Sequence, residues 1–397
     1  MIINLLSYNG IVQPLERVRS YRQFLAYLLI NLVFFTLIYC NNIFKKLILR
    51  DNSLFYSRLS KLDNISNFSL FNRRSYYHTA AGTSIAGDKN NSKILDPWFV
   101  TGFVDAEGSF SMSIFKSKTA AIGWTIEPSF IITLHKKDIE LLNKIQSFFG
   151  VGTVSTVGDK IARYRVRPKN SLLIIISHFN KYPLQTTKVN SFISFCNILD
   201  LMIKKSHVNI EGFLNIASLI NKLNNPLSPS LLENLSLLGE LPDTKAQVLE
   251  LASKKSLLSE NLDPWWISGF TTGEGSFTYF TRNRKKANGE IVKDYTLAFE
   301  VSQRSDSLYV LNLIAKSFEC GKVYSETRGV SKYRLVPRDQ ILKILVPFFE
   351  KYPLEGNKNM QYELWIQIVK ILQTTGRSEQ REISVERLIK KLSELNK

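Results

Sequence analysis

The chain carries one pattern of apolar and polar positions twice. Residues 95–110 read LDPWFVTGFVDAEGSF and residues 262–277 read LDPWWISGFTTGEGSF. In each copy Asp-Pro is a helix start, with Asp as the N-cap and Pro at the first helical position. Apolar residues then recur at helical spacing as far as a Glu-Gly pair. The pattern predicts two matching helices of two to three turns, which end at Glu107 and Glu274.

The duplication continues beyond these helices. Residues 138–149 and 306–318 both show helical spacing, and each is followed by a glycine in reach of a C-cap, Gly150 and Gly321. RYRVRP at 163–168 matches KYRLVP at 332–337, and KYPL occurs at 181–184 and again at 351–354. Residues 110–115 alternate, with Phe110, Met112 and Ile114 on the apolar side, which predicts a strand. Each half therefore predicts helix, two strands, helix, two strands, helix.

The ends of the chain and the segment between the halves have other patterns. We expect an N-terminal extension over 1–93, the first repeat over 94–223, a linker over 224–261, and the second repeat with a C-terminal helix over 262–397. The extension contains an apolar run, 24–40, at the short edge of a membrane span, which needs roughly 20 residues. Two interpretations stay open: a membrane anchor, or a leader that never packs and is disordered or removed.

Charge narrows the class of partner. The chain has 52 Lys and Arg against 34 Asp and Glu, a net charge of +18, which favours a polyanion. A protein of a membrane surface or a ribosome would show the same balance. The three cysteines lie far apart without CxxC spacing, so neither a disulfide framework nor a zinc site is indicated. Abundant Phe, Ile, Asn and Lys are typical of an AT-rich genome such as that of an organelle.

The two helix-end glutamates predict a metal site. Gly102 and Gly269 lie at matching places inside the helices, where glycine costs about 1 kcal/mol relative to alanine, so the pair indicates close approach of two backbones. Packing the helices side by side brings Glu107 and Glu274 together at C-terminal ends, where the helix dipole also disfavours negative charge. A bound Mg²⁺, or another divalent cation such as Mn²⁺, resolves both costs.

TGFVDAEG at 101–108 and SGFTTGEG at 268–275 resemble the signature of LAGLIDADG homing endonucleases, in the monomeric two-repeat form encoded in fungal mitochondrial introns. The resemblance covers about 95–370. It implies an α+β fold of two pseudo-symmetric αββαββα repeats forming a saddle, with four-stranded sheets in the DNA major groove. It also implies a mitochondrial, site-specific double-strand DNA endonuclease.

The same resemblance assigns site residues. It implies that Glu107 and Glu274 hold the metal, with help from the backbone carbonyls of Ala106 and Gly273. The second motif departs from the family pattern, because Thr272 stands where the first has Asp105. We expect Asp105 to cap a helix or join a hydrogen-bond network rather than to bind metal.

Phosphodiester hydrolysis also needs positive charge at the phosphoryl oxygens and an ordered water. The resemblance implies that Lys332 is the basic residue of the centre and that Gln303 orders water, with Arg163 and His135 as their counterparts in the first repeat. The alternative for all four is that of solvated strand residues facing DNA.

The outward positions of the strands are candidates for DNA contact. Arginine reads guanine, hydroxyls donate or accept, and apolar groups meet thymine methyls. The candidates are Ser111, Ser113, Phe115, Ser117, Thr125, Glu127, Ser129, Ile131, Thr133, Arg163, Arg165, Thr278, Phe280, Arg282, Arg284 and Arg334. The same alternation would arise in any half-exposed sheet.

Two other functions compete with DNA cleavage. One is a splicing maturase that binds intron RNA, a role that proteins resembling this family also hold, with or without cleavage. Two intact carboxylates favour retained cleavage, and the roles can coexist. The other is a membrane-associated structural protein, which would use the run at 24–40 but leaves the matched Glu-Gly helices without a purpose.

Overall fold

The computed structural model describes residues 94–223, 226–244, 260–325 and 329–395. These belong to one compact unit of the chain, residues 90–397. The apolar run at 24–40, and with it the choice between anchor and leader, lies outside the described residues, as does part of the expected linker, residues 245–259. Among the described helices, none is long and apolar enough to cross a membrane.

Both repeats follow the order of elements predicted from the sequence. The first consists of α3 (Pro97–Glu107), β1 (Gly108–Lys116), β2 (Trp124–His135), α4 (Ile139–Phe149), β3 (Thr153–Val157), β4 (Ile161–Val166) and α5 (Lys169–Lys181). The second consists of α10 (Pro264–Glu274), β5 (Gly275–Lys285), β6 (Ile291–Arg304), α11 (Leu308–Phe318), β7 (Lys322–Ser325), β8 (Val330–Leu335) and a last helix, α12 to α13, from Arg338 to Lys351. Short 3-10 turns, Lys136–Asp138 and Ser305–Ser307, precede α4 and α11.

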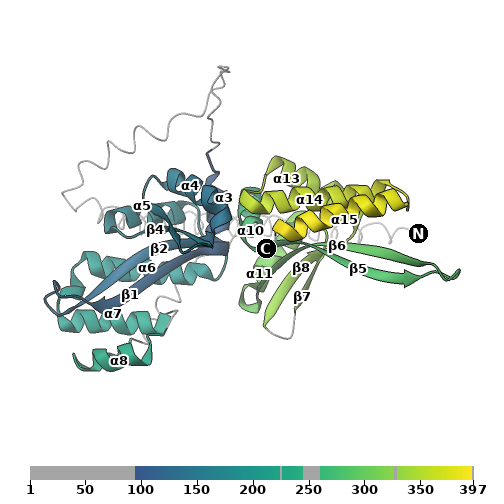
Figure 1. Cartoon of the computed structure of the whole chain (residues 1–397). Helices are drawn as coiled ribbons and strands as arrows, with labels where there is room; N and C mark the ends of the chain where they lie inside the picture. Colours follow the sequence, from purple (N-terminus) through teal and green to yellow (C-terminus); the bar gives the residue numbers. More distant parts are fainter. Residues whose placement is uncertain (1–93, 224–225, 245–259, 326–328, 396–397) are drawn as a thin grey trace, which may run out of the picture. The chain divides into compact units, whose positions relative to one another are not determined.

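Each repeat adds helices of its own. The first continues with α6 (Lys188–Ile203), α7 (Ile210–Leu223) and α8 (Pro229–Ser236), so the segment expected as a linker contains a helix. The second continues with α14 (Gly356–Thr374) and α15 (Glu379–Leu395), the C-terminal helix expected from the sequence. Figure 1 shows α13, α14 and α15 together on one side of the β5–β8 sheet.

The two sheets have the same antiparallel topology, in the order β1-β2-β4-β3 and β5-β6-β8-β7. Phe110 pairs with Phe130 in the first sheet, and Phe277 pairs with Phe299 in the second. The helices cover the face that carries these aromatic residues. The predicted alternation is confirmed, since Phe110, Met112 and Ile114 all pack against the hydrophobic core. The opposite face of each sheet carries the polar positions.

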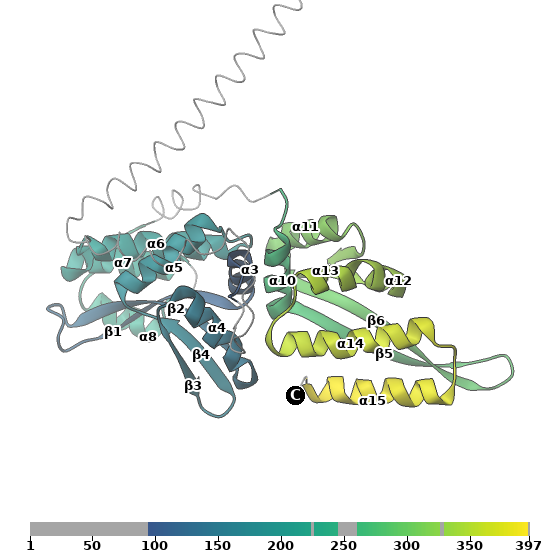
Figure 2. The same cartoon turned by 90° about the horizontal axis from the view of Figure 1, so that it is seen from above.

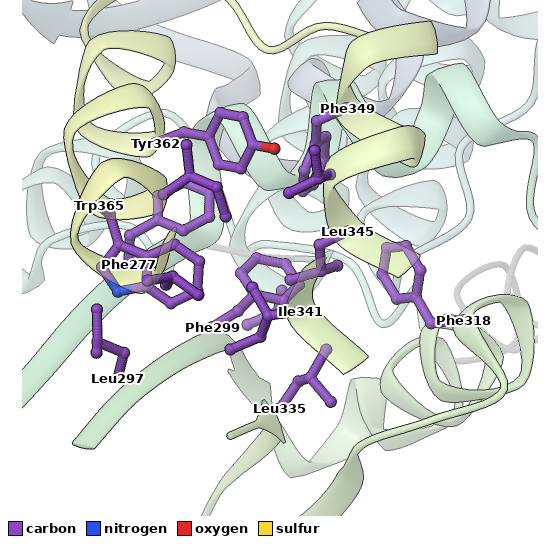
Figure 3. Close-up of a cluster of buried hydrophobic side chains, with 14 of the residues drawn as sticks. Phe277, Leu297, Phe299, Phe318, Leu335, Ile341, Leu345, Phe349, Tyr362 and Trp365 are labelled. Carbon is purple, nitrogen blue, oxygen red and sulfur yellow. The ribbon is translucent and has the colours of Figure 1, made fainter. Parts of the chain in front are cut away.

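Each sheet is backed by its own apolar core. Figure 3 shows the core of the second repeat, where Phe277 and Phe299 of the sheet meet Phe318, Phe349 and Trp365 of the helices. A matching cluster backs the first sheet, and a further one packs α6, α7 and α8 against Trp124 and Ile126 near the tip of its hairpin. Protein interiors pack as densely as crystals of small organic molecules, so these cores keep each sheet rigid.

The two repeats meet along α3 and α10, which Figures 1 and 2 show side by side between the sheets. A Cβ atom added to Gly102 would lie 2.1 Å from the Trp266 carbonyl oxygen, and one added to Gly269 would lie 2.0 Å from that of Phe99. Real Cβ atoms do not approach so closely, so both glycines are required. The predicted close approach of two backbones is confirmed.

One predicted cap is wrong. Gly150 caps α4 in the left-handed conformation, with φ of 67°, as expected. The corresponding cap of α11 is Glu319, with φ of 53°, and not Gly321. Gly321 is needed two residues later, where a Cβ would lie 2.6 Å from the Tyr333 ring. A glycine near a helix end can serve as the cap or can avoid a clash with a neighbouring side chain, and the sequence pattern does not distinguish these two requirements.

Candidate active site and DNA interface

The carboxylate helices start and stop for local reasons. The side chains of Asp96 and Asp263 each accept a hydrogen bond, 2.8 Å long, from the backbone N–H two residues later. At the other end, a Cβ on Gly108 would lie 2.9 Å from the Val104 carbonyl oxygen, and one on Gly275 would lie 2.5 Å from that of Thr271. Glycine therefore lets the chain pass from helix directly into strand. This fixes Glu107 and Glu274 at the two junctions.

Glu107 and Glu274 lie together at the helix interface. A Cβ on Gly273 would be 2.4 Å from the Ala106 Cβ and 3.1 Å from the Glu107 Cγ. Burial raises the pKa of both carboxyl groups, and the charge of Glu107 raises that of Glu274 further. Two partly buried acids that disfavour each other's ionisation are an arrangement that a cation relieves.

Two lysines flank the glutamates. Lys188, the first residue of α6, donates from Nζ to the carbonyl oxygens of Val104 at 2.8 Å and Ala106 at 3.1 Å. Lys358, near the start of α14, donates to the Gly275 carbonyl at 2.5 Å. Burial lowers the pKa of both lysines, while the charges of Glu107 and Glu274 raise it. The structure thus places two ammonium groups beside the paired acids.

The sequence-based assignment omits both lysines, although a signal for them was present. Residues 181–188 read KYPLQTTK and residues 351–358 read KYPLEGNK, so a lysine follows the repeated KYPL by four residues in each half. Besides marking the duplication, this repeated sequence marks the start of the helix that carries each lysine toward the carboxylates.

Asp105 is a network member, as expected. Its buried carboxylate accepts hydrogen bonds from the Gln185 N–H at 2.7 Å and the Thr186 hydroxyl at 2.6 Å. It also accepts one from Trp266 Nε1 of the other repeat, at 2.8 Å. These contacts hold the turn that leads to Lys188. Thr272, at the equivalent place, instead donates to the Ser268 carbonyl at 2.9 Å.

A cavity of 470 Å³ opens beside Glu107. Glu107, His135 and Asp138 of the first repeat line it together with Gly273 and Lys358 of the second. It therefore joins one carboxylate to one of the flanking lysines.

The polar residues assigned to the centre lie in different surroundings. Gln303 hydrogen-bonds Glu274 and thereby lowers the pKa of that carboxyl group. Lys332 lies on the open face of the second sheet, with Nζ 3.8 Å from Glu300 Oε2. Arg163 is the equivalent of Lys332, because Thr133 pairs with Arg163 as Ser302 pairs with Lys332.

His135 is not the counterpart of Gln303. Gly108 pairs with Ile132 and Gly275 pairs with Val301, so two residues further along, Leu134 matches Gln303. An alignment of Asp138 with Asp306 along the sequence therefore places the first repeat one residue out of register with the second. Neighbouring strand residues point to opposite faces of a sheet. His135 therefore lies on the open face, where its Nδ1 accepts a hydrogen bond from the Lys137 N–H at 3.2 Å.

The sequence-predicted contact residues gather on the open faces of the sheets. In the first sheet, Ser113 pairs with Glu127 and Phe115 pairs with Thr125. Ile131 pairs with Arg165 further along the same face. Phe115 and Phe280 lie on these faces and are 45% and 53% exposed. Thr278, Arg282 and Arg284 line the corresponding edge of β5. Arg284 is paired there with Asp294 at 2.8 Å.

Two of these candidates differ from the prediction. Ser129 is only 4% exposed, so its neighbours cover it on the open face. Ser117 lies just beyond β1 in the hairpin turn, where its hydroxyl meets that of Thr119 at 3.1 Å. The alternation ends with the strand, and the sequence alone does not show where.

Known proteins share this arrangement. The model of the LAGLIDADG endonuclease family matches residues 100–199 and 267–369. Probable intron-encoded endonuclease 2 of Neurospora crassa is 33% identical over 272 residues, which are 68% of this chain and 58% of that protein. Probable intron-encoded endonuclease 3 of the same fungus is 29% identical, over 70% of this chain and 51% of its own. The chain thus spans about half the length of these relatives.

Solved structures agree with the fold. I-SmaMI bound to an uncleaved DNA target in the presence of calcium ions has a TM-score of 0.64 and 28% identity, over 74% of this chain and 97% of its own. The LAGLIDADG meganuclease I-CpaMI bound to uncleaved DNA has a TM-score of 0.63 and 29% identity, over 76% and 98%. With two matched repeats and two Glu-ended helices, this chain belongs to the LAGLIDADG endonuclease family.

Proposed function

We propose that the protein is a site-specific DNA endonuclease that hydrolyses both strands of a duplex at one target. The observation that carries this proposal is the junction of α3 and α10, which brings Glu107 and Glu274 together between two sheets with open polar faces. Two sheets on either side of one acidic centre can follow the major groove on both sides of a cut site. Since a single chain supplies both acids, we propose that it acts as a monomer.

The donor set fits a hard divalent cation such as Mg²⁺ or Mn²⁺. Glu107 and Glu274 would hold it, with the backbone carbonyls of Ala106 and Gly273 as further oxygen donors. The Ala106 carbonyl already accepts a hydrogen bond from Lys188 at 3.1 Å, so the lysine and a cation would share this oxygen. When bound, such an ion supplies an activated water and neutralises developing charge.

The side chains of this chain supply the rest of the chemistry. Lys188 and Lys358 would stabilise negative charge on the phosphoryl oxygens, because their ammonium groups are buried beside the acids. Gln303, bonded to Glu274, would orient a water there. Lys332, next to Glu300 on the open face, is 28% exposed and would contact the DNA backbone near the centre.

The proposal extends to context. The relatives are named as intron-encoded endonucleases, which supports a role in intron homing and a mitochondrial location. The net charge of +18 supports DNA as the partner. Within the described residues, no feature favours intron RNA over DNA.

The direct test is cleavage of a randomised duplex library by the full chain with Mg²⁺, followed by sequencing of the cut ends. We expect one enriched target. Glu107→Gln and Glu274→Gln should each abolish cleavage and leave binding of that target within a few-fold, whereas Glu140→Gln, on the exposed first turn of α4, should change neither. Full cleavage by either acid variant would disprove the assignment of the centre.

A further inference from the structure

One rung of the open sheet face differs between the repeats in a way that points to base recognition. The register aligns Ile131 and Arg165 of the first sheet with Glu300 and Arg334 of the second. Both arginines therefore hold the same place relative to the junction of the helices. What differs is the residue beside each arginine on the central strand, an isoleucine in one repeat and a glutamate in the other.

Arg334 is held in place on two sides. Its Nε lies 3.0 Å from Glu300 Oε1, and its guanidinium carbon lies 5.5 Å from the centre of the Phe280 ring. The equivalent of Phe280 in the first repeat is Ser113, because Phe277 corresponds to Phe110. A charge-assisted contact and an aromatic surface together restrict the plane of a guanidinium group. The contact with Glu300 is an ion pair at Nε and not a hydrogen bond.

Glu300 argues against a phosphate clamp. Its side chain is only 9% exposed and lies between Arg334 and Lys332 on the face that meets DNA. A carboxylate there repels phosphate and offsets the positive charge that attracts it. What the carboxylate improves is the orientation of the arginine, and an oriented guanidinium can donate to O6 and N7 of guanine together.

Arg165 has different surroundings. Its Nε, like that of Arg334, is buried without a hydrogen bond to the described residues, but the residue opposite it is Ile131, which offers no carboxylate. Burial lowers its pKa, and the positive charges of Arg167 and Arg163 lower it further, while the charge of Glu127 raises it. Arg163 and Arg167 add positive charge on either side of Arg165. Each has a contact of its own, since Arg163 Nε donates to the Thr133 hydroxyl at 3.3 Å and Arg167 Nε lies 3.4 Å from Glu127 Oε1. Such a row of arginines suits the phosphate backbone.

We propose that Arg334 reads one guanine in the half-site under the second repeat, an inference that rests on the proposed function. Glu300 and Phe280 are its positioning residues. Arg165 contacts backbone at the equivalent place in the other half-site. Recognition of this guanine is therefore one-sided, and the target is not a palindrome at this position.

The test is a binding selection with the full chain on a randomised duplex library, in Ca²⁺ to record affinity separately from cleavage. Wild type should enrich guanine at one position of one half-site. Arg334→Lys keeps the charge and loses the paired donors, so the preference at that position should fall tenfold or more while all other positions stay unchanged. Phe280→Leu should weaken the same position by a smaller factor. Arg165→Lys, the matched control, should change no base preference.

The outcomes separate the two proposals. If wild type selects a sequence and Arg334→Lys keeps every base preference, or weakens all sequences equally, Arg334 is a phosphate contact and the inference is wrong. If wild type selects no sequence, the proposed function is wrong and the inference falls with it. Arg334→Gln, measured alongside with a thermal unfolding control, gives the same decision should the lysine variant fold poorly.

Discussion

The Asp138 carboxylate of the first repeat accepts a hydrogen bond from the backbone N–H of Asn357 in the second, at 2.6 Å. Asn357 lies in the first turn of α14, directly before Lys358. Gly356 has φ of 62°, and a Cβ there would lie 2.5 Å from Asp138 Oδ1. A carboxylate of one repeat thus fixes the helix end that places a lysine of the other. At the equivalent position of the second repeat, Ser307 meets the Thr187 hydroxyl at 3.1 Å.

Loss of this cap should slow cleavage. Removing a capping side chain typically costs about 1 kcal/mol, or roughly a factor of five in an equilibrium constant. Asp138→Ala should therefore lower the single-turnover cleavage rate several-fold, with target affinity nearly unchanged. Asp138→Asn keeps an acceptor oxygen and should recover most of the rate. An asparagine variant as slow as the alanine variant would mean that the charge, and not the cap, is what matters.

The buried lysines should matter for rate more than for affinity. Groups that stabilise charge developing in a transition state are worth about a hundredfold in rate. Lys188→Met and Lys358→Met should each slow cleavage by about that factor and change the dissociation constant of the target only slightly. Lys370→Met, on the exposed side of α14, is the control. Equal losses in rate and affinity would make these lysines DNA clamps.

Substitution at the helix interface should be costly. Gly102→Ala places a Cβ 2.1 Å from the Trp266 carbonyl oxygen, so the helices must move apart. Overpacking of this kind costs about 1–3 kcal/mol or more. Gly376→Ala meets nothing within 4 Å and should shift the unfolding free energy by no more than about 0.5 kcal/mol. Denaturant titration measures both, and equal stability of the two variants would contradict the packing described.

The acidic centre should make the metal-free protein sensitive to pH. Burial raises the pKa of Glu107 and Glu274 above the ordinary value of 4.5, so the folded protein holds protons that the unfolded chain has released. Stability is then greatest below that value and falls as pH rises through the raised pKa. In EDTA at pH 8, Glu107→Gln and Glu274→Gln should unfold at higher temperature than wild type, and the gap should close near pH 4.

Metal should reverse this order. A ligand that binds only the folded state adds stability in proportion to the logarithm of its concentration. Titration of Mg²⁺ should raise the unfolding temperature of wild type and leave the two glutamine variants nearly unchanged. A gain of the same size in all three proteins would show that the ion binds elsewhere.

The order of elements and the helix pair could be read from sequence because their signals are local. Asp-Pro, the mid-helix glycines and the Glu-Gly ends each sit within a few residues of the structure they specify. The alternation of apolar and polar positions along the strands is local in the same sense. These features do not depend on which distant segment lies nearby.

The remaining features depend on contacts across the chain. Lys188 joins the centre because Asp105, some eighty residues earlier, holds the turn before α6. The resemblance implies His135 as the counterpart of Gln303, whereas strand pairing aligns Leu134 with Gln303. Ser129 looked open by alternation and is covered by its neighbours. Pairing and coverage of this kind are set by tertiary structure.

Because both repeats lie in one chain, the residues on their two open faces can differ at equivalent positions. Were the protein a dimer of identical halves, a change from isoleucine to glutamate on one central strand would appear on both. Here Ile131 and Glu300 occupy equivalent positions and are encoded separately. On the proposed function, each sheet could therefore be changed to fit a new DNA half-site without altering the other sheet, so long as the glycine-packed helices between them stay intact.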